Sequence, residues 1–107
     1  MDLYFDPDGQ PITRDQWADL YTRPRTIART SSPRGTVSTI YMGLDMGIGR
    51  GLPPLIYESM VFGGDLDGYV DRYPTRAMAL AGHRAIVRGV RGNAKPLIHR
   101  GRAWRGR

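Results

Sequence analysis

Residues 38–64 read STIYMGLDMGIGRGLPPLIYESMVFGG and decide the fold, because two segments rich in β-branched and aromatic residues flank a loop of glycines and prolines. This pattern predicts a β-hairpin. The loop is not expected to cradle a nucleotide phosphate, because Pro53 and Pro54 lack backbone donors and block a helix after the glycines. It also lacks the Lys-Ser/Thr pair of a P-loop. We therefore expect a plain connecting loop.

The register of this hairpin decides which side chains share a face of the sheet. If the strands pair symmetrically about the loop, Met46 lies opposite Leu55, and two carboxylates become diagonal neighbours. The resulting candidate ligand or partner face consists of Tyr41, Asp45, Glu58 and His83. A slip of one residue would scramble this face.

The two carboxylates of this face have a second interpretation. Glu58 can pair with one of the 16 basic side chains of the protein, and Asp45 can cap the loop turn. A metal site is not predicted, because two carboxylates without a third ligand hold a metal poorly.

On the N-terminal side of the hairpin, residues 4–13 (YFDPDGQPIT) predict two short extended pieces around a turn. A helix follows, since Thr13 can act as N-cap, Gln16 completes a capping box and Pro24 ends the helix. Residues 26–30 (TIART) predict a strand that pairs with the hairpin.

On the C-terminal side, a second helix is predicted to begin at Pro74 and Thr75 and to end at Gly92. The order of elements predicts an α+β fold: a small antiparallel sheet, made of an N-terminal short hairpin plus a three-strand meander, with two helices packed on one face. Residues 1–93 are expected to form a single domain, and residues 94–107 a basic tail rich in arginine and glycine.

The totals limit the class of protein. A chain of 107 residues is one domain by size, and an apolar fraction of 40% is typical of a globular domain. There is no cysteine, so disulfides and cysteine-based zinc sites are excluded. No apolar run approaches the roughly 20 residues that span a bilayer, and the acidic start is not a secretory signal. We expect a cytoplasmic protein without a membrane partner.

Positive charge is concentrated at the C-terminal end. Residues 84–107 carry eight basic side chains and no acid, whereas the first 83 residues hold eight arginines and ten acids. Such asymmetry favours a polyanionic partner. The tail adds a tryptophan that can stack on a base. The candidate polyanion-binding residues are Arg84, Arg88, Arg91, Lys95, Arg100, Arg102, Trp104, Arg105 and Arg107. The alternative is a solvated helix face with a solubilising tail.

His83 is the residue most easily mistaken for a catalytic base. It shares one helix face with Leu80, Ile86, Val87 and Val90, which favours a half-buried packing residue with one hydrogen bond. No nucleophile–base pair or acid–base pair of carboxylates can be assembled from the spacing. We therefore expect neither an enzyme nor a bound cofactor.

Three separated segments carry a resemblance: VSTIYMGLD (37–45), PPLIYESMVF (53–62) and RYPTRAMALAGH (72–83). With an opening similar to the pattern Y-D-x-x-G-x-P-(I/L)-T (YFDPDGQPIT at residues 4–13) and a tryptophan-bearing helix, the chain resembles small proteins of bacteriophages, chiefly phages of actinobacteria, and of some of their hosts. The resemblance spans about residues 4–83 and implies no established activity. The positions that it carries over are Trp17, Gly43, Asp45, Glu58, Tyr73 and His83. The group often has a histidine where this chain has Met46, and the basic tail lies outside the resemblance.

Taken together, the sequence predicts a small phage-type accessory protein that binds nucleic acid or an acidic host-protein surface through a basic helix face and tail. One alternative is a domain that sequesters a ligand or inhibits a host enzyme with the face around Asp45 and Glu58. Another is a virion or assembly component. The oligomeric state is left open.

Overall fold

The computed structural model of the chain describes residues 3–45 and 53–92. These residues form two helices and a four-stranded antiparallel sheet, which confirms the α+β class. In chain order the elements are α1 (Arg14–Tyr21), β1 (Thr26–Ser32), β2 (Gly35–Tyr41), β3 (Tyr57–Phe62), β4 (Val70–Tyr73) and α2 (Arg76–Gly92).

The sheet is a meander in which each strand pairs with the next, in the order β1-β2-β3-β4. Strand β4 was not predicted from the sequence. The expected N-terminal hairpin is reduced to two isolated bridges, Tyr4 with Leu44 and Phe5 with Pro11. The Tyr4–Leu44 bridge joins the N-terminal segment to the chain just after β2, whereas the Phe5–Pro11 bridge lies within the segment, so no full strand is added to the sheet.

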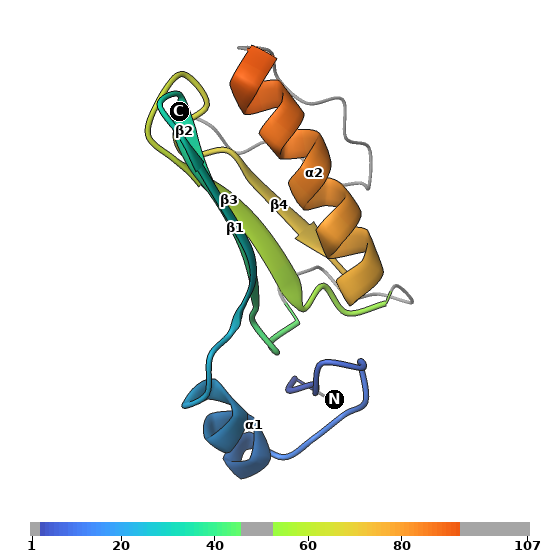
Figure 1. The fold of residues 1–107 in the computed structure, drawn as a ribbon. Helices are drawn as coiled ribbons and strands as arrows, with labels where there is room; N and C mark the ends of the chain where they lie inside the picture. The colour runs from blue at the N-terminus through green and yellow to red at the C-terminus, as the bar shows by residue number, and fades with distance from the viewer. Residues whose placement is uncertain (1–2, 46–52, 93–107) are drawn as a thin grey trace.

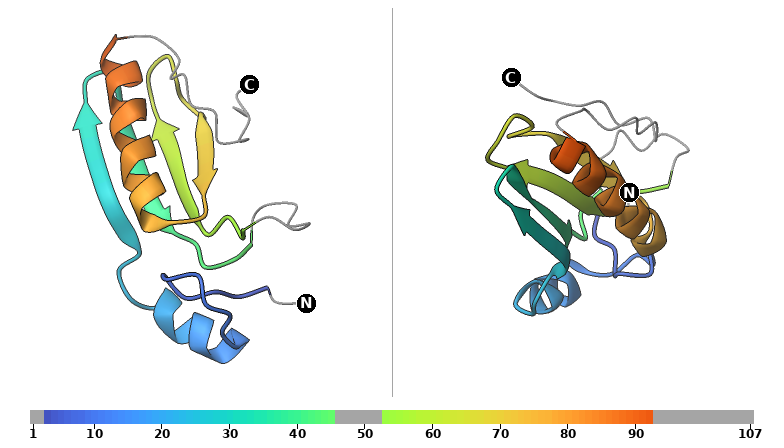
Figure 2. Two further views of the ribbon diagram at one scale, coloured as in Figure 1. Left: turned by 90° about the vertical axis from the view of Figure 1, so that its right-hand side faces the viewer. Right: turned by 45° about the horizontal axis from the view of Figure 1, so that its top comes forward.

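Of the two helices in the described residues, only α2 packs on the sheet, and it contacts all four strands on one face (Figures 1 and 2). Helix α1 lies beyond the end of the sheet, beside the N-terminal segment (Figure 1). This differs from the expectation that both helices share one face. The reason lies in the chain between α1 and β1, which runs only from Thr22 to Arg25 and leaves α1 at the end of β1.

Helix α1 begins with the predicted capping box, in which the Thr13 side chain accepts from the Gln16 backbone and the Gln16 side chain accepts from the Thr13 backbone. Trp17 anchors the helix, because its indole N–H donates to the Met42 carbonyl at 3.0 Å. Gly43 allows this contact: its φ is +71°, and an added Cβ would lie 2.6 Å from the indole. The close approach therefore requires glycine at this position.

The predicted hairpin register is wrong. Tyr41 pairs with Tyr57 and Ile40 with Glu58, a slip of three residues from the symmetric pairing. Because successive side chains alternate between faces, an odd slip moves every side chain of β3 to the other face relative to β2. Tyr41 therefore faces α2, whereas Glu58 lies on the opposite face of the sheet.

The interior between the sheet and α2 has two apolar clusters. The first, near the start of α2, contains Phe5, Tyr41, Ile56, Tyr57, Tyr73 and Ala79. The second, near its end, contains Val37, Val61, Leu66, Tyr69, Ile86 and Val90. Between them the strand register places one row of polar residues, Thr39, Ser59 and Asp71. We call this row, together with His83 of α2 above it, the polar belt.

Helix α2 has the boundaries that the sequence predicted. The Thr75 hydroxyl accepts from the Met78 backbone at 3.1 Å and so caps its first turn, and the helix ends at Gly92. In its middle, Gly82 lies against the ring of Tyr73 and leaves no space for a Cβ. This close approach fixes the height of α2 above the sheet.

Candidate nucleic-acid interface

Three arginines lie in line on the outer surface of α2. Arg84, Arg88 and Arg91 are all exposed, and their spacing of four and three residues places them on one helix face. The buried residues of the helix, among them Ile86 and Val90, face the sheet on the opposite side. We call Arg84, Arg88 and Arg91 the α2 arginine face.

No negative charge on the helix offsets this face. Helix α2 contains four arginines and no acidic residue. Within residues 3–45 and 53–92, the ion pairs are Asp19 with Arg23 and Glu58 with Arg72, so the α2 arginine face takes part in none. Burial is the main cause of the lowered pKa of His83, and the charge of Arg84 lowers it further. The positive field of the helix therefore also acts on the interior.

The remaining predicted polyanion-binding residues lie outside the described residues. They are Lys95, Arg100, Arg102, Trp104, Arg105 and Arg107. The part of the basic set that the structure places is therefore the α2 arginine face.

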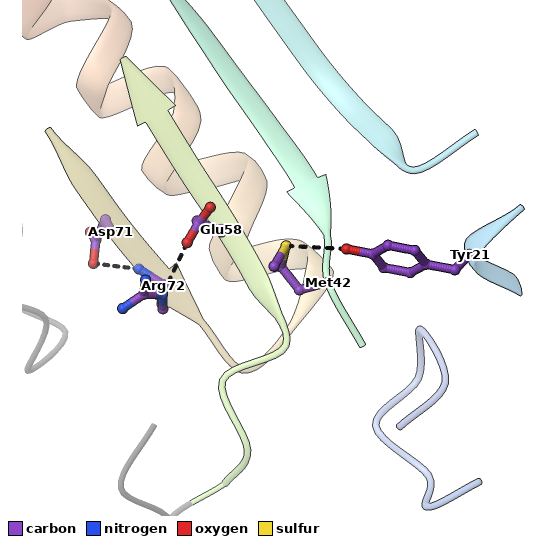
Figure 3. Close-up of polar contacts among 5 residues, drawn as sticks. All are labelled: Tyr21, Met42, Glu58, Asp71 and Arg72. Carbon is purple, nitrogen blue, oxygen red and sulfur yellow. Dashed lines mark hydrogen bonds and ion pairs between the residues drawn. The ribbon is translucent and has the colours of Figure 1, made fainter. Parts of the chain in front are cut away.

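The structure does not bring the other candidate face together. Glu58 accepts from Arg72 Nε at 3.0 Å on the sheet face that points away from α2 (Figure 3), and both side chains are largely buried, at 11% and 17% exposed. The alternative that Glu58 pairs with a basic side chain is confirmed. Asp45 lies beyond the end of β2, where its carboxylate accepts from the Leu55 backbone at 3.3 Å. It thereby ties together the two ends of the intervening loop.

His83 is more buried and more fully bonded than expected. It is 5% exposed, and it makes two hydrogen bonds and not one. Its Nδ1 lies 2.7 Å from the hydroxyl of Thr39, and its Nε2 lies 2.9 Å from the hydroxyl of Thr30. Burial lowers the pKa of His83, with Arg84 as a second cause, so the neutral imidazole is favoured.

The polar belt continues from His83 across the sheet. The Thr39 and Ser59 hydroxyls are 2.6 Å apart, and Ser59 lies opposite Asp71, which is 1% exposed. Thr39 and Ser59 have no exposed surface at all. Both hydroxyls are closed off from solvent, and the belt forms a structural connection. It joins α2 to β1 and β2 through directional bonds between the two apolar clusters.

The alternation of residues along β2 and β3 contains a sequence signal for the polar belt. Thr39 lies two residues from Val37 and from Tyr41, so the period of two along a strand places all three on one face. Ser59 has the same relation to Tyr57 and Val61. A small polar residue in an otherwise apolar alternating row indicates a buried hydrogen bond.

Tyrosine hydroxyls fasten the N-terminal segment to the sheet. Tyr57 donates to the Pro7 carbonyl at 2.7 Å, and Tyr41 donates to the Phe5 carbonyl. Burial raises the pKa of Tyr41 to about 12, with Asp6 contributing, and burial also raises the pKa of Tyr57. Both hydroxyls therefore keep their protons, and both protons are committed to backbone carbonyls.

Among residues 3–45 and 53–92, no group of three His, Asp or Glu side chains lies close enough together to hold a metal ion. No helix in this part of the chain has the length and apolar character to cross a membrane. Comparisons with protein-family models, with curated proteins and with solved structures find no match.

Proposed function

We propose that this protein binds nucleic acid through the α2 arginine face, with the basic tail extending the contact. The observation that carries the proposal is the alignment of Arg84, Arg88 and Arg91, exposed and without an ion pair in the described chain, on a helix free of acids. Arginine suits such a role, because its guanidinium grips phosphate oxygens with two donors.

The geometry of the helix fits a run of phosphates. At a rise of 1.5 Å per residue, the face extends over about 10 Å from Arg84 to Arg91. A single strand of B-DNA carries one charge per roughly 3.4 Å of axis, so three long side chains can reach several successive phosphates. Such contacts position a protein on a backbone without reading its sequence. We therefore propose binding that tolerates many sequences.

The contacts that fix α2 on the sheet support the same proposal. Its inner side is held by the His83 bonds to Thr30 and Thr39 and by the close contact of Gly82 with Tyr73. A helix fixed in this way presents its arginines without ordering the backbone at the moment of binding, which reduces the entropic cost of binding.

A phage-type accessory role, in line with the resemblance to bacteriophage proteins, is part of the proposal. The tail residues Arg100 and Arg102, which lie outside the described residues, would add phosphate contacts in it.

The experiment is fluorescence anisotropy of the full chain with a labelled duplex of about 20 base pairs and with a matched single strand, at several salt concentrations. For three neutralised phosphates, the logarithm of the affinity should fall with the logarithm of the salt concentration with a slope of about −2.7 on the duplex, and with a steeper slope if the tail adds contacts. Absence of salt-dependent binding to both probes would reject a nucleic-acid function and redirect the search to an acidic protein partner.

A further inference from the structure

A cavity of about 180 Å³ lies where the end of α1, the end of β2, the start of β3 and the start of α2 meet. Three arginines line it: Arg23, Arg25 and Arg76. Tyr41 and Tyr57 line it as well, and no carboxylate is among the described residues of the lining. None of the α2 arginine face residues is part of the lining.

The three guanidinium groups differ in the interactions that they make with neighbouring side chains. The Arg25 guanidinium lies 3.7 Å from the centre of the Tyr21 ring, which orients it, and no acid of the described ranges forms an ion pair with it. Arg23 pairs with Asp19 at 2.8 Å, but both side chains are about two-thirds exposed, at 64% and 65%. Such an exposed pair is weak and exchanges readily. Arg76 is exposed and belongs to none of the ion pairs within residues 3–45 and 53–92.

Arg76 is also close to the wall of the cavity. Burial raises the pKa of Tyr57, and the charge of Arg76 acts against that rise, so its guanidinium lies within electrostatic range of the Tyr57 hydroxyl. Arg76 is the first residue of α2, where the helix dipole adds positive potential.

The tyrosines shape the cavity without competing for its ligand. The Tyr41 and Tyr57 protons are donated to the Phe5 and Pro7 carbonyls, so these hydroxyls have none left for an anion. Asp6 acts on both tyrosines and Asp8 acts on Tyr57, and the Asp6 carboxylate already accepts from two backbone N–H groups in its own turn. Recognition of an anion therefore falls to the guanidinium groups, with tyrosine rings as apolar walls.

We propose that this cavity binds a phosphate group, either as free phosphate or as the monoester of a small molecule. Three arginines that line one cavity match a dianion better than a single carboxylate, because each guanidinium can give two parallel hydrogen bonds. The volume is below the roughly 300 Å³ of a site for a drug-sized ligand, so the phosphate group fits inside and the remainder of an ester lies outside. This site is separate from the α2 arginine face and goes beyond the proposed function.

The test is a titration of the ¹⁵N-labelled full chain followed by amide chemical shifts, at constant ionic strength. The probes are inorganic phosphate in one arm and uridine 5′-monophosphate in the other. We expect saturable shifts at Ile27, Tyr41, Tyr57 and Arg76. Tighter binding of the ester would identify a phosphorylated small molecule as the ligand, and equal or tighter binding of inorganic phosphate would identify free phosphate.

Two variants of the cavity lining and one control decide whether the cavity is responsible. Arg76→Gln should weaken phosphate binding about tenfold, the loss of one charge-assisted contact. Arg34→Gln removes the same charge at an exposed position of the turn between β1 and β2, outside both the cavity lining and the α2 arginine face, and should leave phosphate binding unchanged. Arg25→Met provides a second variant of the lining, with the same expected loss. Shifts that do not saturate, or equal losses in Arg76→Gln and Arg34→Gln, would overturn the proposal.

Discussion

The Nδ1 atom of His83 lies 2.7 Å from the Thr39 hydroxyl, and this contact joins α2 to the centre of the sheet. Both residues are buried, and both are bonded to a further partner: His83 to Thr30 and Thr39 to Ser59. Because buried polar groups are costly when one partner is lost, the contact holds the helix at one position along the sheet. The α2 arginine face on the outer surface depends on that position.

Replacing Thr39 tests this connection. Thr39→Val keeps the shape of the side chain but removes the hydroxyl between His83 and Ser59. We expect the free energy of unfolding to fall by about 1–3 kcal/mol, because two buried groups lose a partner. Urea denaturation measures the change. Thr36→Val, which removes a hydroxyl bonded to Ser31 at the exposed end of the same strand, is the control and should change stability by less than about 0.5 kcal/mol. Equal losses in the two variants would refute the role of the belt.

The stability of the protein should depend on pH through His83. Its folded-state pKa lies below the ordinary value of 6.5, mainly because burial penalises the charged imidazolium. The unfolded chain therefore takes up the proton first as the pH falls. The stabilisation is complete above pH 6.5 and is lost as the pH falls through the folded-state pKa, with a slope of up to about 1.4 kcal/mol per pH unit.

Urea midpoints measured between pH 7.5 and pH 5 test this dependence, with His83→Gln as the comparison. The variant should lose the His83 contribution to the slope while keeping those of all other groups. A wild-type curve that parallels the variant curve over this range would mean that His83 is not held neutral by burial.

Gly82 should reject even alanine. An exposed Gly-to-Ala change within a helix usually raises stability by about 0.5–1 kcal/mol. At position 82 the added Cβ would overlap the ring of Tyr73, so we expect a loss of about 1–3 kcal/mol. Gly92→Ala at the end of the same helix is the matched control, because nothing lies within 4 Å of its Cβ position. Thermal unfolding separates the two cases, and a stabilised Gly82→Ala protein would contradict the close packing.

Local signals predicted the helices correctly, whereas the sheet depended on partners distant in sequence. The capping box of Thr13 and Gln16 and the boundaries of α2 follow from residues a few positions apart. Strand β4 was missed because its four residues include Asp71 and Arg72, and pairing with β3 rather than local preference makes it a strand. Arg72 is then the residue that meets Glu58.

The register of β2 and β3 was missed for a related reason. Fifteen residues separate Tyr41 from Tyr57, and a connection of this length does not fix the pairing as a two-residue turn does. The burial of Tyr41 opposite Tyr57 fixes it instead, since that pairing aligns both rings under α2. The candidate face around Asp45 and Glu58 depended on the wrong register. The α2 arginine face depended only on helical spacing, and its exposure is confirmed.

The measurement that tests the central claim most directly compares the salt dependence of duplex binding for three proteins by fluorescence anisotropy. They are the full chain, Arg84→Gln/Arg88→Gln, and the control Arg14→Gln/Arg29→Gln, which removes the same charge at exposed positions away from α2. We predict that the first variant reduces the magnitude of the salt slope by about 1.8, because two phosphate contacts are lost, and that the control leaves the slope unchanged. Equal slopes in all three proteins, or equal reductions in the two variants, would contradict binding through the α2 arginine face.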